Sequence, residues 1–383
     1  MIRVLILVPE LPLNIDNIKG GVHAASINLI KGFLLLKINV RVISFTRAVN
    51  EKIIYKISSK IEIVYLPEGP FKYHSFNYLF IVPRKLKSQI KEFNPDLIHF
   101  EVGNTFMFSK ILGLYKKKYL LTIHGMSYEE GRIKYKWKDK FIWFFNAFIQ
   151  DIMYPKNVIH LSHYSQNKFS RFKETHSVII PNAVNEIYFK IPLKNNTQNK
   201  LLYIGLIDTN KNLIFLLKQL AYLNKHNFNF TLEIVGDFVS LDYKNIIMEF
   251  IQNNNLFELV KFRGWITQTG LISILSESDI LVVSSMHESL PMVISESMAS
   301  GKVVVCSNVG GIPEMITDKI TGFLFSLENE HLFLEILKLL YNNKNLCQEI
   351  GKNAKRYSFE NFRSVCVAEK TFDFYNKIIY DSI

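Results

Sequence analysis

The chain has 383 residues, with 46 Lys and Arg against 34 Asp and Glu, and a formal net charge of +12. That length favours two domains, and a hydrophobic fraction of 48% with 21% charged residues excludes a disordered or fibrous chain. Three cysteines without a C-x-x-C pair exclude a disulfide scaffold and fit a reducing compartment.

Apolar runs typical of buried parallel strands alternate with helical patterns from the N-terminus onward. A strand is predicted at 3–9, followed by a glycine loop and an amphipathic helix near 22–36. Further strands of this half are predicted at 40–45, 95–100, 119–125 and 157–165. The polar, Asn-rich segment 190–200 interrupts the pattern. We therefore predict a first α/β domain over residues 1–188.

The same alternation begins again after this segment. A strand at 201–207 precedes a helix near 211–224, and a last helix is predicted at 358–381. The other strands of this half are predicted at 230–238, 260–266, 279–285, 302–308 and 321–326. We therefore predict a second domain over residues 189–365, with the same doubly wound plan as the first.

The positive charge is confined to the first half of the chain. Residues 1–190 contain 28 Lys and Arg and 14 Asp and Glu, a formal charge of +14, whereas residues 191–383 contain 18 and 20, a formal charge of −2. No helix-turn-helix, zinc-finger or RNA-recognition pattern accompanies this excess. We expect no nucleic-acid partner, and a module that binds polyanions through charge alone is the weaker alternative.

The segment 287–325 contains two glutamates eight residues apart, Glu288 and Glu296, with Pro291 between them. Proline is well tolerated in a first helical turn, so a helix is predicted to begin near 289–291, with Glu296 about two turns inside. A helix N-terminus beside a parallel sheet suits a phosphate, and ionised carboxylates accept hydrogen bonds from hydroxyl groups. The segment predicts a site for a phosphate flanked by sugars; two solvated helix residues are the alternative.

The text HESLPMVISESMASGKVVVCSNVGGIPEMI (287–316) resembles the C-terminal signature of GT-B glycosyltransferases, specifically the retaining family 4 or glycosyl transferases group 1. The resemblance implies two Rossmann-like doubly wound domains facing a central cleft, with a helix at about 366–383 crossing back to the first. It implies that the first domain binds the acceptor and the second the nucleotide-sugar donor.

The same resemblance assigns roles to residues of this segment. Glu288 would contact hydroxyl groups of the donor sugar, and Glu296 would bind the nucleotide ribose. Backbone N–H groups around Leu290 and Met292 would face the diphosphate, whereas Pro291 has no N–H to donate. Ser289 completes this predicted donor-binding stretch.

Two segments of the first half agree with the resemblance. The text IPNAVNEIYF (180–189) resembles the family's I-P-N-G-V-D-x-x-x-F segment. Gly20 and Gly21 resemble its glycine-rich loop, where the backbone approaches the donor phosphate or the acceptor; a simple tight turn is the alternative. His124 matches the family's strand-end histidine close to the donor sugar, and a structural histidine is the alternative.

One position departs from the family pattern. The family has G-R-x-x-x-x-K after the first strand of its second domain; here Gly205 and Lys211 match, but Leu206 stands at the arginine position. The resemblance implies that Lys211 neutralises the diphosphate. The missing cation is replaced by another residue such as Arg263, or the donor binds differently, or the activity is weak.

Several motifs are absent from the sequence. It has no D-x-D, no zinc-ligand spacing, no G-x-G-x-x-G and no G-x-x-x-x-G-K-[ST], which argues against a metal-bridged diphosphate, a dinucleotide oxidoreductase and a P-loop NTPase. We expect no metal and no cofactor, with a UDP- or GDP-linked sugar as the donor.

The segment 132–152 combines an apolar helical stripe with flanking lysines. It predicts either a helix on an anionic membrane, near a lipid-linked acceptor, or a domain helix with solvated lysines. The membrane- or acceptor-contacting candidates are Lys134, Lys136, Trp137, Lys138 and Lys140. We expect a cytoplasmic protein, either free or peripheral on the inner face of the plasma membrane.

The sequence therefore predicts a retaining, metal-independent glycosyltransferase that acts on a glycan or lipid-linked acceptor. The abundance of Lys, Asn and Ile is typical of AT-rich bacterial genomes, which favours a role in surface polysaccharide such as lipopolysaccharide or capsule. The alternative is a glycan- or nucleotide-binding protein on the same fold with weak or no turnover.

Overall fold

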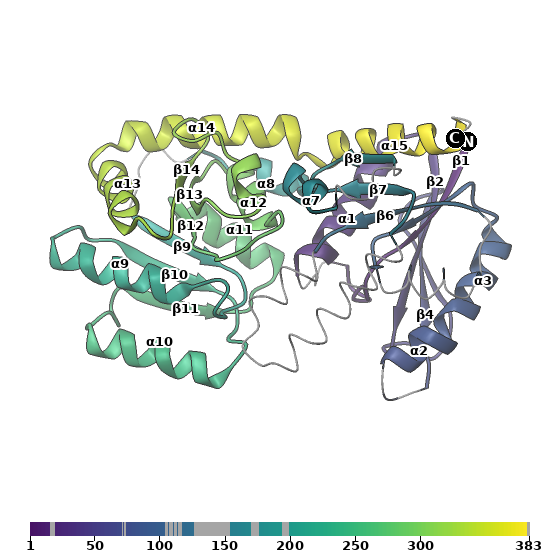
Figure 1. Cartoon of the computed structure of the whole chain (residues 1–383), viewed down its shortest axis with the longest axis horizontal. Helices are drawn as coiled ribbons and strands as arrows, with labels where there is room; N and C mark the ends of the chain where they lie inside the picture. The colour runs from purple at the N-terminus through teal and green to yellow at the C-terminus, as the bar shows by residue number, and fades with distance from the viewer. Residues whose placement is uncertain are drawn as a thin grey trace. The chain divides into compact units, whose positions relative to one another are not determined.

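The computed structural model describes residues 1–15, 20–70, 72, 74–103, 106, 110, 113, 117–125, 154–169, 176–193 and 199–380. The chain forms two compact units: unit 1 is Met1–Ala183 with Ser364–Ile383, and unit 2 is Val184–Arg363 (Figure 1). The first boundary lies five residues before the expected residue 188, and the second lies two residues before the expected residue 365.

The described residues of unit 1 form an eight-stranded sheet in the order β3-β4-β2-β1-β5-β6-β7-β8. All neighbouring strands pair in parallel except β3 and β4, which are antiparallel. The strands are β1 (Ile2–Leu7), β2 (Ile38–Thr46), β3 (Ile53–Lys56), β4 (Ile61–Pro67), β5 (Leu97–Phe100), β6 (Lys118–Ile123), β7 (Asn157–His160) and β8 (His176–Ile179). Because helices cover both faces of the sheet, strands such as β5 are buried throughout.

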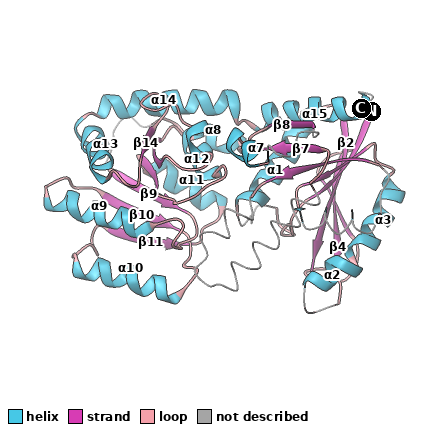
Figure 2. Ribbon diagram, viewed as in Figure 1, coloured by secondary structure: helices cyan, strands magenta, loops and turns pink. Residues whose placement is uncertain are grey.

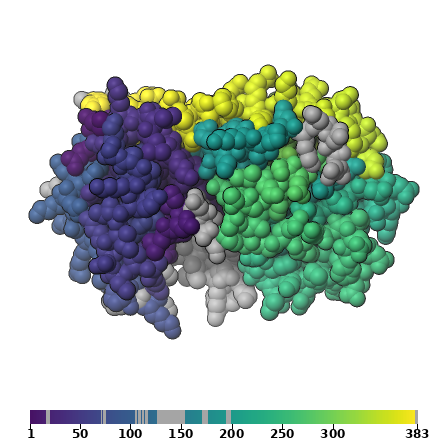
Figure 3. Space-filling view, turned by 180° about the vertical axis from the view of Figure 1, so that it is seen from behind, coloured from purple at the N-terminus to yellow at the C-terminus, as the bar shows by residue number. Residues whose placement is uncertain are grey.

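Helices flank this sheet (Figure 2). They are α1 (Gly21–Gly32), continued by a short 3-10 turn at Phe33–Leu35, α2 (His74–Phe80), α3 (Val82–Phe93), α7 (His163–Lys168) and the C-terminal α15 (Ser364–Tyr380). Although α15 follows unit 2 in the chain, its apolar side places Val367, Phe374 and Tyr375 in the core of unit 1. Figure 3 shows this C-terminal segment, in yellow, lying on the purple N-terminal residues.

Within the described residues, unit 2 has a six-stranded parallel sheet in the order β11-β10-β9-β12-β13-β14. Its strands are β9 (Lys200–Ile204), β10 (Thr231–Val235), β11 (Val260–Gly264), β12 (Ile280–Val283), β13 (Val303–Ser307) and β14 (Phe323–Phe325). In sequence terms this is the order 3-2-1-4-5-6 of a doubly wound nucleotide-binding fold. The two sheets confirm the predicted fold class.

The helices of unit 2 pack on both faces of this sheet (Figures 1 and 2). They are α8 (Glu186–Phe189), α9 (Leu213–Lys225), α10 (Leu241–Asn253), α11 (Gln268–Glu277), α12 (Met292–Ala299), α13 (Glu330–Asn342) and α14 (Lys344–Asn361), with a 3-10 turn at Ile312–Glu314. Leu216, Leu232 and Phe333 are among the fully buried side chains of its core.

Two predicted elements differ from the structure, and some strands were missed. The strand predicted at 157–165 ends at His160, because Ser162 accepts a hydrogen bond from the backbone N–H of Ser165 (3.1 Å) and begins α7. The helix predicted at 358–381 is two helices, since α14 ends at Asn361 before α15 begins. Strands β3, β4 and β8 were not predicted at all.

In the part of the chain that the structure describes, no helix is long and apolar enough to cross a membrane.

Candidate functional site

The C-terminal edge of the unit 2 sheet brings together two residues that are 77 positions apart in the chain, Lys211 and Glu288. Lys211 Nζ and Glu288 Oε1 form a close ion pair, and Ser285 Oγ donates to the same Oε1 at 2.6 Å. The loops that carry them follow β9 and β12, which are neighbours at the switch point of the doubly wound sheet. Ligands of such sheets bind outside the carboxyl ends of the strands at this point.

Asn210 connects these two loops through three hydrogen bonds. Its side chain donates to the carbonyl of His287 and accepts from the N–H of His287, both at 3.1 Å, and its carbonyl accepts from the N–H of Met286 at 2.7 Å. In addition, Asp208 accepts a hydrogen bond from the backbone N–H of Lys211 at 2.9 Å. The position of the Lys211 side chain beside Glu288 therefore depends on hydrogen bonds that hold the backbone of the two loops, and not only on the ion pair.

Glycines allow the backbone to pack closely around this ion pair. Gly310 has φ +57°, and a Cβ there would lie 1.8 Å from the carbonyl oxygen of Glu288. The N–H of the next residue, Gly311, donates to that oxygen at 3.0 Å. At the end of β9, Gly205 has φ +150°, and its carbonyl oxygen would lie 1.9 Å from a Cβ at Gly236. Only glycine fits at Gly236 and Gly310.

The helix predicted near 289–291 begins at Met292, with Pro291 as its N-cap. No side-chain hydrogen bond caps this terminus in the described residues of unit 2. The N–H of Ile294 donates to the carbonyl of Pro291 at 3.2 Å, which leaves the N–H groups of Met292 and Val293 as the candidates for an anion. Glu288 lies in the loop before the helix, as predicted. Ser289 is half-buried, whereas Leu290 and Met292 are buried.

Glu296 lies about one turn inside α12, not two, and its side chain is buried. Burial raises the pKa of Glu296 to about 8, and a hydrogen bond with Tyr188 of α8 acts in the opposite direction. Tyr188 is itself buried and is also hydrogen-bonded to Gln268 of α11. In the structure Glu296 is therefore hydrogen-bonded to Tyr188. Its binding of ribose stays a prediction.

Leu206 stands where the family has an arginine, and Arg263 is the candidate that would replace this arginine. The two side chains differ in exposure and in their partners. Leu206 follows β9 and is 60% exposed, and its carbonyl accepts from the hydroxyl of Tyr203 at 3.0 Å. Arg263 in β11 is ion-paired with Glu233 in β10 at 2.8 Å. The hydrogen bond from this carboxylate raises the pKa of Arg263, and the role of Arg263 as a replacement for the arginine stays a prediction.

The site residues predicted in unit 1 lie at the carboxyl ends of its strands. Gly20 has φ +94° and is the N-cap of α1, which begins at Gly21. His124 follows β6, and its Nε2 lies 2.5 Å from Oε2 of Glu101, which follows β5. The Glu101 side chain is nearly fully buried, and no sequence motif had singled it out.

Two family models match the chain in succession. The model of Glycosyltransferase Family 4 matches residues 19–186, and that of Glycosyl transferases group 1 matches residues 184–357. The second match covers Lys211, Glu288 and Glu296. The chain belongs to the group 1, family 4 glycosyltransferases.

Relatives and solved structures are consistent with this membership. The glycosyltransferase is 26% identical over 291 residues to a protein of Methanocaldococcus jannaschii named uncharacterized glycosyltransferase MJ1178, covering 75% of this chain and 77% of that one. Its fold is that of sucrose-phosphate synthase from Thermosynechococcus elongatus (TM-score 0.82, 18% identity, 100% of both chains). It also matches Anabaena Alr3699/HepE, solved with UDP-glucose (TM-score 0.72, 17% identity, 98% of this chain and 100% of that one). The predicted GT-B fold and enzyme class are confirmed.

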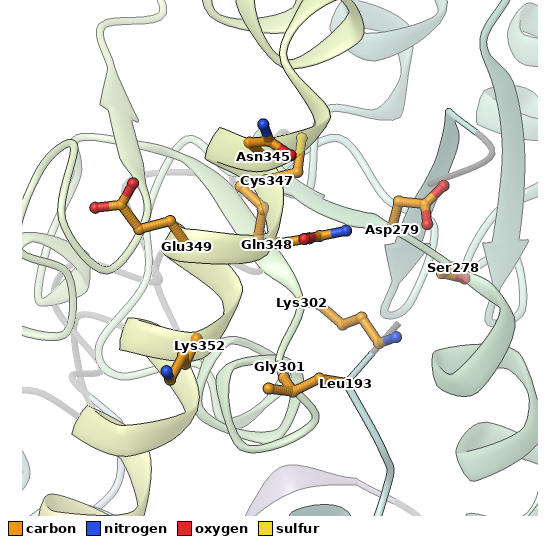
Figure 4. A pocket seen from close by; sticks show the side chains of 11 residues that line it. Leu193, Ser278, Asp279, Gly301, Lys302, Asn345, Cys347, Gln348, Glu349 and Lys352 are labelled. Carbon is orange, nitrogen blue, oxygen red and sulfur yellow. The ribbon is translucent and has the colours of Figure 1, made fainter. Parts of the chain in front are cut away.

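A cavity of about 450 Å³ lies at the opposite edge of the unit 2 sheet of this glycosyltransferase (Figure 4). Asp279 and Lys302, which precede β12 and β13, lie on one side of it, and Gln348 of α14 lies on the other. Ligands of doubly wound sheets bind at the carboxyl ends of the strands, whereas this cavity is at the amino ends. It is therefore separate from the ion pair of Lys211 and Glu288.

The sequence did not reveal the residues that contact the predicted side chains in each unit. These are Asn210, Asp208, Ser285 and Tyr188 in unit 2 and Glu101 in unit 1. The spacing D-x-N-K of residues 208–211 is the one local signal, because it places a turn-forming side chain just before Lys211. The predicted membrane or acceptor residues lie outside the described residues; they are Lys134, Lys136, Trp137, Lys138 and Lys140.

Proposed function

We propose that this glycosyltransferase moves a sugar from a nucleotide-sugar donor to a saccharide or lipid-linked acceptor, with retention of the anomeric configuration and without a metal ion. The observation that carries the proposal is the pair Lys211–Glu288 beside the uncapped N-terminus of α12. The Anabaena protein solved with UDP-glucose supports a UDP-linked donor.

The chemistry of this cluster suits a departing diphosphate. Lys211 supplies a positive charge, and the first-turn N–H groups of α12 supply hydrogen-bond donors that need no reorganisation during the reaction. Glu288, held by Ser285, supplies acceptors for sugar hydroxyl groups. Without a donor the lysine and the glutamate pair with each other, so donor binding exchanges this ion pair for contacts with the diphosphate and the sugar. In unit 1 we assign to His124 a hydrogen bond with a hydroxyl group of a sugar substrate.

A purified-protein assay tests this function. A panel of UDP- and GDP-sugars is screened by thermal shift, and the active donor is followed by product formation with and without EDTA. NMR of the product reports the anomeric configuration. Lys211→Ala is expected to lower kcat by about 10²-fold, whereas Lys225→Ala, an exposed lysine at the end of α9, keeps full activity. Folded protein that turns over no nucleotide sugar contradicts the proposal.

The alternative is a binding protein on the same fold with weak or no turnover. Its structural support is that Leu206 stands at the usual arginine position and that Arg263 is engaged by Glu233. The two functions differ in one result of the same assay: the alternative predicts a thermal shift with the nucleotide sugar, but no product at any acceptor concentration.

We further propose that the acceptor belongs to a bacterial surface polysaccharide, such as lipopolysaccharide or capsule, and that the protein works at the cytoplasmic face of the membrane. The formal charge of +14 on residues 1–190 supports an anionic surface as partner. Deletion of the gene in its own host should remove one sugar from the surface polysaccharide, as read by mass spectrometry, and an unchanged polysaccharide contradicts this role.

Helices α2 and α3 offer a described surface for such a contact. The helical hydrogen bonds continue across their junction, from Ile81 N–H to the carbonyl of Asn77 at 2.8 Å and from Lys85 N–H to the carbonyl of Ile81 at 3.2 Å. Five exposed residues therefore recur at three- to four-residue intervals along one stripe. They are Phe76, Phe80, Arg84, Lys87 and Lys91.

This stripe combines two stacked rings, with centroids 6.4 Å apart, and three cations. Aromatic rings enter the headgroup layer, and cations bind anionic lipids. Each Lys or Arg near the surface contributes about 1 kcal/mol to the free energy of membrane binding. Changing Arg84, Lys87 and Lys91 together to Ser is expected to release the protein from vesicles with anionic lipid. The matched control changes three exposed lysines of unit 2 to Ser, namely Lys225, Lys244 and Lys261. Equal vesicle binding by both variants contradicts the assignment.

A further inference from the structure

Four polar side chains project from two neighbouring strands of unit 1 to the same face of its sheet. Alternate residues of an extended segment share a face. His99 in β5 and Glu101, directly after it, therefore point to one side, as do Thr122 in β6 and His124, directly after it. The strands are parallel neighbours, with Phe100 paired to Leu121. This face is the one covered by α15, because the preceding residues on it, at 97 and 120, are in the same core cluster as the apolar side of that helix.

Hydrogen bonds connect these side chains into one buried chain that ends on α15. The hydroxyl of Tyr375 lies 2.7 Å from His99 Nδ1, and His99 Nε2 lies 3.0 Å from Glu101 Oε1. Thr122 Oγ1 lies 2.7 Å from His99 Nε2 and donates to Glu101 Oε1 at 3.3 Å. The other carboxylate oxygen of Glu101 lies 2.5 Å from His124 Nε2. Tyr375 is 276 residues from His99 in the chain.

The charge of Glu101 fixes the direction of these hydrogen bonds. Oε1 of Glu101 accepts from the hydroxyl of Thr122, and each carboxylate oxygen lies within 3.0 Å of a histidine ring nitrogen, so the group acts as a carboxylate that only accepts. His124 must then donate through Nε2–H. His99 likewise donates from Nε2, which leaves its Nδ1 to accept from the hydroxyl of Tyr375.

One end of this hydrogen-bonded series is open. Among the residues that the structure describes, none is a hydrogen-bond partner of the buried Nδ1 of His124, although the side chain is 10% exposed. Buried polar atoms are normally satisfied, so an orphaned one needs an explanation. The ring borders a small cavity of about 20 Å³, which His99, Glu101 and Thr122 also line. When the ring carries one proton, at Nε2 and donated to Glu101, its Nδ1 presents a lone pair.

We propose that Glu101 is the positioning residue of His124, and that Tyr375 holds Glu101 in place through His99, so that His124 Nδ1 accepts a hydrogen bond from a sugar hydroxyl group. This inference rests on the proposed function, which assigns a sugar contact to His124. It gives α15 a part in the site of unit 1, because the helix supplies the far end of the hydrogen-bonded chain.

The kinetic test compares three variants. Glu101→Gln keeps the shape of the side chain but removes its charge, and is expected to lower kcat by about 10- to 100-fold, as for other histidines that lose an orienting carboxylate. Tyr375→Phe removes one hydrogen bond and is expected to lower kcat by about three- to tenfold. The control is Tyr65→Phe, since Tyr65 is a buried tyrosine of unit 1 whose hydroxyl donates to the carbonyl of Pro12 at 2.9 Å. It should lose similar stability while keeping kcat.

A second measurement does not depend on turnover. Nitrogen-15 NMR of the histidine rings should show His124 with a protonated Nε2 and an unprotonated Nδ1 in the wild type. In Glu101→Gln the amide can donate to Nε2, so the protonated nitrogen should change to Nδ1. A wild-type ring protonated at Nδ1 alone overturns the inference, as does full kcat in Glu101→Gln. If the wild type turns over no sugar, the proposed function fails, while the NMR result still decides whether Glu101 orients His124.

Discussion

Leu206 is the residue at which the sequence departs from the family pattern G-R-x-x-x-x-K. It lies immediately after β9, five positions before Lys211, and its side chain is 60% exposed. Leu206→Arg therefore adds a cation without displacing a buried group. Because charge-assisted hydrogen bonds are among the strong ones, kcat/KM for the nucleotide sugar is expected to rise about tenfold.

Steady-state kinetics measures this change. The matched control is Leu241→Arg, which adds the same charge at another exposed leucine of unit 2, 75% exposed in α10. An equal gain in both variants, or no gain in Leu206→Arg, contradicts a role for position 206 at the diphosphate.

Glu296 makes the stability of unit 2 depend on pH. Its pKa is about 8 in the folded protein and near 4.5 in the unfolded chain, so between these values the folded state binds more protons. The free energy of unfolding then falls as the pH rises from about 4.5 to 8. Glu296→Gln removes this loss and should be more stable than the wild type at pH 8 by on the order of a few kcal/mol, but not at pH 4.5.

Urea unfolding at a series of pH values checks this dependence. Glu328→Gln, at an exposed glutamate of unit 2, serves as the control and should follow the wild-type curve. If the curves of Glu296→Gln and the wild type run parallel across the whole range, Glu296 is ionised in the folded protein over that range.

Helices α1 and α15 pack closely at Gly32. A Cβ at this position would lie 2.2 Å from the carbonyl oxygen of Ser364 and 2.7 Å from Cβ of Ala368. Gly32→Ala should push the helices apart and destabilise the protein by about 1–3 kcal/mol. Calorimetry measures the loss. Gly103→Ala, where no atom lies within 4 Å of the added Cβ, should be nearly neutral, and equal stability of the two variants contradicts the close packing.

The local elements were predicted well where the pattern depends on neighbouring residues only. The strands β9, β12 and β13 are short apolar runs and lie within one or two residues of their predicted starts. The break between α14 and α15 was missed, because apolar periodicity continues through Phe362 and does not show that the second helix packs on another unit. Strand β3 was missed because all four of its residues are exposed.

At the scale of the whole molecule, α15 is covalently continuous with unit 2 but completes the core of unit 1. Val367, Ala368 and Phe374 are buried in that core, so a chain that ends after Arg363 should lose the stability of unit 1 while unit 2 stays folded. Hydrogen exchange should then show loss of amide protection in residues 1–183 and native protection in 184–363. A control that removes only residues 381–383 should match the full chain, and equal protection of unit 1 in both truncations contradicts this role.

The sequence by itself determined the fold class and the family, because these depend on periodicity and on a motif within about 40 residues. Tertiary structure alone decided which side chains meet. It paired Lys211 with Glu288 across 77 residues and Tyr375 with His99 across 276, and it engaged Arg263 with Glu233 on the adjacent strand. The physical reason is that the order of the strands and the packing of the helices decide which of these residues lie close together. Neither can be predicted from the spacing of residues along the chain.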